Sequence, residues 1–265
     1  MDLRIAGKTA LITASSSGIG LAAATAIAAE GAVVVLNGRD ADRLKQAEER
    51  LRAHAPDASV RLVVADVGTE EGARAVTAAE PAVDILVNNV GAYGPANFAD
   101  ITDEQWTRYW EVNVLSGIRL ARHYLPGMLD RDDDGRIVLL GTDAAVMVSS
   151  MMMHYEVTKS AVLALARGLA DLTRGTSVTV NSVVPGPTAT DGMESVLEGI
   201  ASNTGVSRDD VVAGFFAQGR PASLLQRLAT AGEVANLITY LASPRAAATN
   251  GAAVRVEGGS IPTVL

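Results

Sequence analysis

Residues 9–20 read TALITASSSGIG, and this stretch decides the fold. The apolar run from Thr9 to Thr13 predicts a buried strand, and the Ala-rich segment after Gly20 predicts a helix. The serines and glycines between them are small enough to let a phosphate group approach the backbone. The N–H groups that open a helix attract anions, because they carry positive partial charge. The stretch therefore predicts a dinucleotide-binding loop between the first strand and the first helix.

Short apolar runs and longer amphipathic segments alternate along the rest of the chain. This alternation predicts a single α/β domain over residues 1–265, a Rossmann fold whose doubly wound parallel sheet has about seven strands with helices on both faces. We expect strands at Thr9 to Thr13, Val33 to Asn37, Val60 to Val64, Ile85 to Asn88, Arg136 to Leu140, Val178 to Val183 and Ala253 to Val256. We expect helices at Gly20 to Glu30, Ala41 to His54, Thr69 to Ala79, Asp103 to Leu125, Tyr155 to Thr173 and Ala231 to Leu241.

The segment from about residue 191 to 222 fits this alternation poorly. It contains several glycines, a polar stretch and then an apolar run, Val211 to Phe216. Such a segment is typical of a mobile helical lid over a substrate, and the alternative is a plain surface excursion.

The composition excludes several classes of function. Lys and Arg number 22 against 30 Asp and Glu, so the net charge of −8 disfavours nucleic acid and acidic membrane surfaces as partners. The chain has no Cys, which rules out disulfides and thiolate metal sites. No signal peptide or membrane-spanning run is present, and no His/Asp/Glu cluster has metal-ligand spacing. We expect a cytoplasmic protein without a metal.

The end of the second expected strand bears on the choice of cofactor. About twenty residues beyond the loop, a carboxylate would bind the ribose 2′-hydroxyl of NAD, but the chain reads Asn37-Gly38-Arg39 there. A guanidinium can instead bind the 2′-phosphate of NADP, so NADP is favoured over NAD. The alternative is a solvated arginine that pairs with Asp40 or Asp42.

Tyr155 and Lys159 are the candidate catalytic pair. They lie four residues apart in an expected helix, so they share one face. A neighbouring ammonium lowers the pKa of a phenol, which is ordinarily about 10. The tyrosine can then exchange a proton with a carbonyl or alcohol oxygen.

Six motifs in the same order along the chain resemble those of the short-chain dehydrogenase/reductase family, in its NADP-preferring carbonyl or 3-oxoacyl reductase branch. They are Thr13 to Gly20, Asp66-Val67, Asn88-Asn89-Val90-Gly91, Asn113, Tyr155 to Lys159, and Pro185-Gly186-Pro187-Thr188-Ala189-Thr190.

The resemblance implies roles for four catalytic residues. Tyr155 would act as acid and base, Lys159 would lower its pKa and hold the nicotinamide ribose, Thr142 would bond the substrate oxygen, and Asn113 would hold a water that feeds a proton relay. The implied cofactor-binding residues are Thr13, Ser15, Ser16, Ser17, Gly18, Ile19, Gly20, Arg39, Asp66, Val67, Asn89, Gly91, Tyr155, Lys159, Pro185, Gly186, Thr188 and Thr190. The family's pattern also implies a homo-oligomer, a tetramer or a dimer.

The chain departs from the family pattern at two positions. Thr142, 13 residues before Tyr155, replaces the family's serine and keeps the hydroxyl, so we expect activity to survive, although reduced. Ala14 replaces the first glycine of the loop. An alanine is tolerable there only if φ is negative and no atom crowds its methyl group.

Other side chains near these motifs invite a role. His154, next to Tyr155, points in a different direction along the helix, and we interpret it as non-catalytic. Met151, Met152 and Met153 either line a pocket mouth or pack. Asp143 either contacts a polar substrate group or caps a loop. Trp106, Tyr109 and Trp110 are expected to pack, and they also suit a subunit interface.

The function predicted from these observations is hydride transfer between NADP(H) and a ketone or secondary alcohol. Two alternatives stay open: an NAD-dependent alcohol dehydrogenase, and a catalytically silent dinucleotide-binding protein. The expected pocket segments, Tyr93 to Phe98, Ala144 to Met153 and Met193 to Phe216, are rich in apolar residues, and the first two contain no Arg or Lys. They favour a partly apolar carbonyl compound over a small anion.

Overall fold

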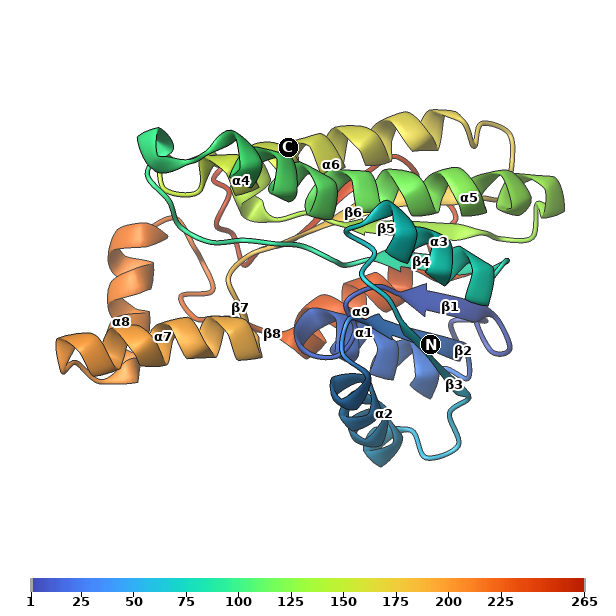
Figure 1. Ribbon diagram of the computed structural model, residues 1–265, viewed down its shortest axis with the longest axis horizontal. Helices are drawn as coiled ribbons and strands as arrows, with labels where there is room; N and C mark the ends of the chain where they lie inside the picture. Colours follow the sequence, from blue (N-terminus) through green and yellow to red (C-terminus); the bar gives the residue numbers. More distant parts are fainter. Residues whose placement is uncertain (1, 265) are drawn as a thin grey trace.

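The computed structural model describes residues 2–264, and its centre is a parallel sheet of seven strands (Figure 1). The sheet order is β3-β2-β1-β4-β5-β6-β9, and every neighbouring pair is parallel. The strands are β1 (Thr9–Ile12), β2 (Val33–Gly38), β3 (Val60–Val64), β4 (Ile85–Asn88), β5 (Arg136–Leu140), β6 (Thr179–Pro185) and β9 (Ala253–Val256). The predicted doubly wound sheet is confirmed, and so are its seven strands to within two residues at each end.

Helices cover both faces of this sheet (Figure 1). The helices α1 (Gly18–Ala29), α2 (Ala41–His54) and α9 (Ala231–Leu241) pack on one face, and α3 (Glu70–Ala79), α5 (Ser116–Arg131) and α6 (Met153–Asp171) pack on the other. Successive strand residues alternate between the two cores: Ala10 and Ile12 lie in the first, and Leu11 lies in the second. The strands read as continuous apolar runs because both of their faces are buried.

The order of the strands alone predicts where a ligand would bind, without reference to any side chain. After β1 the chain builds β2 and β3 on one side, and then crosses to build β4 on the other side of β1. At this switch point the connections leave β1 and β4 in opposite directions, and ligands of open α/β sheets bind just outside the carboxyl ends of the two strands. Residues 13–20 and 89–91 follow these two ends directly.

One predicted helix differs from the structure. The expected helix from Asp103 to Leu125 is divided into α4 (Asp103–Trp110), a π-helical turn (Glu111–Leu115) and α5. The helix also continues through Pro126 to Arg131, whereas we expected it to end before the proline. Pro126 is exposed, so water can bind the carbonyl that its missing N–H leaves without a partner.

The segment from residue 191 to 222 is helical, as expected, and projects from the sheet at the carboxyl ends of the strands (Figure 1). It contains α7 (Asp191–Thr204), α8 (Arg208–Gly214) and a second π-helical turn (Phe215–Gly219). The short strands β7 (Thr188–Ala189) and β8 (Ala229–Thr230) pair with each other at its base. Leu197, Phe216 and Leu228 give it a small core of its own.

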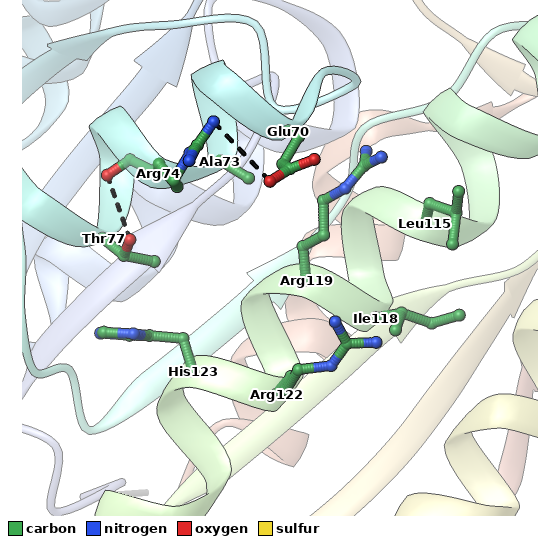
Figure 2. Close-up of a pocket in the computed structure, with 9 residues that line it drawn as sticks. All are labelled: Glu70, Ala73, Arg74, Thr77, Leu115, Ile118, Arg119, Arg122 and His123. Carbon is green, nitrogen blue, oxygen red and sulfur yellow. Dashed lines mark hydrogen bonds and ion pairs between the residues drawn. The ribbon is translucent and has the colours of Figure 1, made fainter.

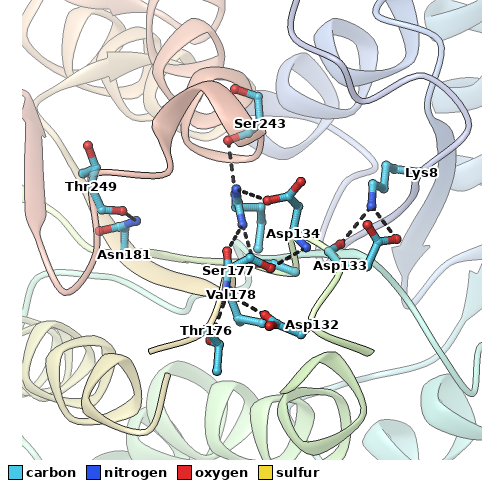
Figure 3. A network of polar contacts seen from close by, with 12 residues as sticks. Lys8, Asp132, Asp133, Asp134, Thr176, Ser177, Val178, Asn181, Ser243 and Thr249 are labelled. Carbon is cyan, nitrogen blue, oxygen red and sulfur yellow. Dashed lines mark hydrogen bonds and ion pairs between the residues drawn. The ribbon is translucent and has the colours of Figure 1, made fainter. Parts of the chain in front are cut away.

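The amino ends of the strands hold a buried arginine with a structural role. Arg136, at the start of β5, is 1% exposed and donates to the carbonyls of Gly135, Ser177 and Ser243. Its guanidinium also pairs with Asp134 at 3.3 Å (Figure 3). These contacts fasten the turns at the amino end of the sheet, opposite the predicted site. Within residues 2–264, no helix combines the length and apolarity needed to cross a bilayer.

Candidate active site

Two buried hydroxyl groups hold the dinucleotide loop in place. Thr13 and Ser15 are both 0% exposed. The Thr13 hydroxyl accepts the backbone N–H groups of Asn89 and Val90 at 2.9 and 3.0 Å, which joins the ends of β1 and β4. The Ser15 hydroxyl donates to the carbonyl of Ile12 at 2.8 Å and accepts the N–H of Asn37 at 3.0 Å. These two side chains therefore shape the loop from inside it, and neither residue is exposed at its surface.

The outer part of the loop is the part that a phosphate can reach. Ser16, Ser17, Gly18 and Ile19 are partly exposed where α1 begins, with Ser17 at its N-cap. Gly20 is buried, and a Cβ there would lie 2.5 Å from the Asn89 amide nitrogen. Glycine is therefore required at residue 20 for the two loops to close on each other.

The backbone angle φ at Ala14 differs from the expected one. We expected alanine to be tolerated only with a negative φ, but φ at Ala14 is +49°. Its carbonyl is held there by the Asn89 amide at 3.1 Å. An L-residue in the left-handed region is strained by contact of its Cβ with its own backbone, so this loop stores strain that a glycine would not.

Asn113 ties three segments together. It lies in the π-helical turn and is 1% exposed. Its side-chain oxygen accepts the N–H of Ala92 at 2.7 Å, and its amide nitrogen donates to the carbonyl of Ala92 and to the Thr158 hydroxyl. Because both amide hydrogens are used by the protein, a water at Asn113 would bind its backbone carbonyl, which π-helical turns often leave without a regular partner.

Lys159 lies under the segment that Asn113 holds. It is 4% exposed, and its Nζ donates to the carbonyl of Leu140 at 2.8 Å. A Cβ at residue 91 would lie 3.2 Å from the Nζ, so Gly91 leaves space beside the ammonium. Burial lowers the pKa of Lys159 to about 8. Among the described residues, its Nζ has no second hydrogen-bond acceptor.

Tyr155 lies one helical turn before Lys159 on α6. Burial raises the pKa of its phenol above the ordinary value of 10.0, the Thr142 hydroxyl lowers it, and the charge of Asp143 raises it further. The lowering that we expected from Lys159 is not found, because desolvation of the phenolate outweighs the favourable contributions. Tyr93 lies on the other side of the phenol, with 6.2 Å between the two ring centroids.

Thr142 and Asp143 lie close to the Tyr155 phenol. Thr142 Oγ1 donates to Asp143 Oδ1 at 3.2 Å and accepts the N–H of Ala144, so it also caps the short turn that follows β5. Asp143 is 3% exposed, and its Oδ2 lies 3.2 Å from Nε of Arg220. Burial raises the pKa of Asp143, and the charge of Arg220 opposes that shift.

Arg39 lies at the end of β2, beside the loop. Its side chain is 73% exposed and makes only a long ion pair, 3.8 Å, with Asp66. Asp40 caps α2 by accepting the N–H groups of Asp42 and Arg43, so it is not the partner of Arg39. Asp66 and Val67 follow β3 as expected, but the Val67 side chain is 2% exposed and belongs to the core.

The last motif follows β6. A Cβ on Gly186 would lie 2.7 Å from the Glu257 carbonyl, so β6 and the segment after β9 pack closely there. Thr188 donates to the carbonyl of Gly186 at 2.8 Å. Thr190 caps α7, and its methyl group would lie 3.3 Å from a Cβ on Gly18. The dinucleotide loop and the start of the 191–222 segment are therefore in contact.

The residues beside Tyr155 pack rather than react. The His154 ring is 2% exposed, with its centroid 4.0 Å from that of Tyr109 and 6.2 Å from that of Trp106. Trp110 differs from its two aromatic neighbours because it is 43% exposed. Met152 and Met153 are half-buried, and Met151 is exposed.

A separate depression of about 570 Å³ lies between α3 and α5 (Figure 2). Arg74, Arg119 and Arg122 contribute its positive side chains, Glu70 is its one carboxylate, and His123 also lines it. Arg119 is held by Glu111 and by the carbonyl of Gly68. None of the predicted site residues lines this depression, so it is not the site that the motifs form.

Residues 13–260 match a family model described as Enoyl-(Acyl carrier protein) reductase. The chain belongs to the short-chain dehydrogenase/reductase family. It is 43% identical over 264 residues to the uncharacterized oxidoreductase YvaG of Bacillus subtilis, with all of both chains covered. It is 31% identical to D-beta-hydroxybutyrate dehydrogenase of Cupriavidus necator, covering 96% of this chain and 97% of the relative.

The fold of this short-chain dehydrogenase/reductase is also similar to that of solved structures. L-sorbose reductase from Gluconobacter frateurii, complexed with NADPH and L-sorbose, superimposes with a TM-score of 0.92 at 34% identity, and all of both chains is covered. The chain is therefore an oxidoreductase by family and by fold.

Sequence reasoning did not predict three contacts beside the site, although Tyr93 begins an expected pocket segment and Gly192 and Arg220 lie in the expected lid. Arg220 reaches Asp143 from the end of the 191–222 segment. Tyr93 lies over Tyr155, and a Cβ on Gly192 would lie 2.2 Å from the Tyr93 hydroxyl, so glycine is needed there. No local pattern marks these contacts, because each joins segments far apart in the chain.

We expect Ala14→Gly to stabilise the protein by about 1 kcal/mol, since glycine adopts a positive φ without strain and this gain exceeds its larger entropy in the unfolded state. Denaturant unfolding measures the change. Ala75→Gly, on the exposed face of α3, is the matched control and should lose about 1 kcal/mol. If Ala14→Gly also lowered the free energy of unfolding by about 1 kcal/mol, the loop would not be strained at residue 14.

The stability of the α4–α6 contact should depend on pH through His154. Burial lowers the pKa of His154 below its ordinary 6.5, with the charge of Glu156 opposing the shift. The unfolded chain therefore binds the proton more readily, and the free energy of unfolding should fall as the pH falls through 6.5. Urea unfolding between about pH 7.5 and about pH 5.5 measures this slope. His154→Phe should flatten the slope, while the exposed-site control His54→Gln should not; equal slopes in all three proteins would exclude His154 as the cause.

Proposed function

We propose that this protein is an NADP(H)-dependent oxidoreductase that interconverts a ketone and a secondary alcohol, with Tyr155 as general acid and base. The observation that carries the proposal is the arrangement of the half-buried Tyr155 phenol, the buried Thr142 hydroxyl and the buried Lys159 ammonium around the carboxyl ends of β4 and β5. A proton donor, an oxygen-binding hydroxyl and a fixed cation are the groups that carbonyl reduction needs.

The reaction balances in the reductive direction. Held by the loop after β1 and by Lys159, a reduced nicotinamide would supply the hydride for the carbonyl carbon and would leave as the oxidised cofactor. The Tyr155 phenol gives its proton to the carbonyl oxygen, so that the product is the alcohol. Thr142 bonds the same oxygen as charge develops on it. The Tyr155 phenol carries its proton at neutral pH, because burial raises its pKa above the ordinary value of 10.0.

The residues around the loop fit a dinucleotide. Ser16 to Ile19 present backbone at the start of α1 for the pyrophosphate. Lys159 and Gly91 leave a cationic space for the nicotinamide ribose. Thr188 and Thr190 lie on the nicotinamide side, and Asp66 and Val67 on the adenine side. The 191–222 segment, which begins in contact with the loop, is placed to act as a lid over a bound cofactor.

Two observations favour NADP over NAD. Arg39 is exposed beside the loop and is held only by the 3.8 Å ion pair with Asp66, so turning it toward a 2′-phosphate costs little. The L-sorbose reductase similar to this chain was solved with NADPH.

We also infer a homo-oligomer, a dimer or tetramer, formed through the helices on the face that carries Tyr155. Several large apolar side chains on this face are exposed: Trp110 by 43%, Val157 by 40% and Leu172 by 62%. A second copy of the chain would remove them from water, which is favourable in proportion to the apolar area buried.

Tyr155→Phe should lower turnover of a ketone by a factor of about a thousand or more and leave NADPH binding within about threefold. The substitution removes the transferable proton and little of the surface. Steady-state kinetics and a fluorescence titration with NADPH give the two quantities. Tyr240→Phe, on α9, is the control, and unchanged turnover in Tyr155→Phe would place the acid elsewhere.

Arg39→Ala should weaken NADPH binding by about tenfold or more and change NADH binding by less than about twofold, because only NADPH carries the 2′-phosphate. Parallel titrations with both cofactors at fixed salt measure this. Arg50→Ala, an exposed arginine on α2, controls for the general loss of positive charge. An equal loss for both cofactors would overturn the assignment and favour an NAD-dependent dehydrogenase.

A further inference from the structure

A buried ion pair joins the reaction site to the 191–222 segment. Asp143 is the residue after Thr142 and is 3% exposed. Arg220, just after the second π-helical turn, places its Nε 3.2 Å from Asp143 Oδ2, and its side chain is 25% exposed. The pair therefore connects the end of β5 to a segment that follows it by more than seventy residues.

The pair is not satisfied by hydrogen bonds. Asp143 Oδ2 and Arg220 Nε are both buried, and neither has a hydrogen-bond partner among the described residues, although they lie 3.2 Å apart as charges. Buried polar atoms left in this state are costly, so native proteins seldom keep them. One hydroxyl group satisfies both atoms, because it donates to a carboxylate and accepts from a guanidinium.

The position of the pair relates such a hydroxyl to the reacting carbonyl. The Thr142 hydroxyl, which would bond the substrate oxygen, lies 3.2 Å from Asp143 Oδ1. The charge of Asp143 also acts on the Tyr155 phenol. A ketone oxygen held by Thr142 and Tyr155 would therefore lie beside the residue that carries the Asp143 carboxylate.

The charges near the pair exclude an anionic group at this place. Asp143 compensates Arg220, and the carboxylate of Glu257 also acts on Asp143. A substrate carboxylate next to the carbonyl would be repelled by the carboxylates of Asp143 and Glu257, and the one arginine nearby is already paired with Asp143. A neutral hydroxyl adds no charge and is not repelled.

We propose that Asp143 and Arg220 determine substrate specificity, and that the substrate is a neutral ketone with a hydroxyl on the carbon next to the carbonyl. This inference rests on the proposed carbonyl reduction. The substrate hydroxyl donates to Asp143 Oδ2 and accepts from Arg220 Nε, and in doing so it links the bound substrate to the segment that covers it.

Three ketones of matched size test the proposal with NADPH. Hydroxyacetone carries the hydroxyl, butanone replaces it by a methyl group, and pyruvate replaces the hydroxymethyl group by a carboxylate. We expect kcat/KM for hydroxyacetone to exceed that for each of the other two by at least about tenfold. Equal values for hydroxyacetone and butanone, or a preference for pyruvate, would overturn the proposal.

Substitution of the pair separates specificity from structure. Asp143→Asn keeps the shape but frees the charge of Arg220, so the ratio of kcat/KM for pyruvate to that for hydroxyacetone should rise at least about tenfold. Arg220→Met should lower kcat/KM for hydroxyacetone about tenfold and leave butanone within about threefold. Arg208→Met breaks the Arg208 and Glu194 ion pair in the same segment. It should change neither the pyruvate-to-hydroxyacetone ratio nor the hydroxyacetone-to-butanone ratio of kcat/KM. An equal loss for all substrates in both variants of the pair would show that the pair only holds the segment in place.

A binding measurement distinguishes failure of this inference from failure of the proposed reaction. The Tyr155→Phe variant, saturated with NADPH, is titrated with hydroxyacetone and with butanone, and its thermal unfolding is followed. Stabilisation by hydroxyacetone alone supports the specificity even if no carbonyl is turned over by the wild type. Stabilisation by neither ketone, or by both equally, rejects the specificity even if the wild type reduces ketones.

Discussion

The side-chain amide of Asn113 makes the contacts on which the site depends most. Its three hydrogen bonds join the π-helical turn, the backbone of Ala92 after β4, and Thr158 on α6. Thr158 in turn donates to the carbonyl of Tyr155 at 2.7 Å and precedes Lys159 directly. One amide thus sets the distance between the segment after β4 and the helix that carries Tyr155 and Lys159. Hydrogen bonds that hold the neighbours of a site in place give the site its geometry, because they fix the backbone and the rotamers of its residues.

The site stores unfavourable free energy at several points, and the rest of the fold offsets it. Lys159 is a buried ammonium with one protein acceptor, Tyr155 is a phenol whose pKa is raised by desolvation, and Ala14 has a positive φ. Each of these would destabilise a protein without a compensating partner. The sheet provides the compensation, since both of its faces are covered by continuous aliphatic cores. A bound dinucleotide would then recover part of this free energy through contacts with the same groups.

The pairing of Asp143 with Arg220 gives the 191–222 segment a chemical role in addition to its position. The apolar composition of the expected pocket segments indicated only a partly apolar carbonyl compound. The structure adds an ion pair between Asp143 and Arg220, which connects this segment to the residue after Thr142. Under the proposed specificity, a substrate without the hydroxyl leaves these buried polar atoms unpaired and is therefore bound less well.

The sequence by itself determined the parallel sheet and its seven strands, the loop after β1 and the family, because these depend on short-range periodicity and on small residues at fixed spacing. It also identified the Tyr155 and Lys159 pair, since two residues of one helix need only their spacing to share a face. It did not determine that the helix carrying Asn113 is interrupted by a π-helical turn, that Ala14 has a positive φ, or that the pKa of Tyr155 is raised. Nor did it reveal Tyr93 over the phenol or Arg220 against Asp143. These features arise from contacts between segments distant in the chain and from the burial that those contacts produce, so only the tertiary structure could decide them.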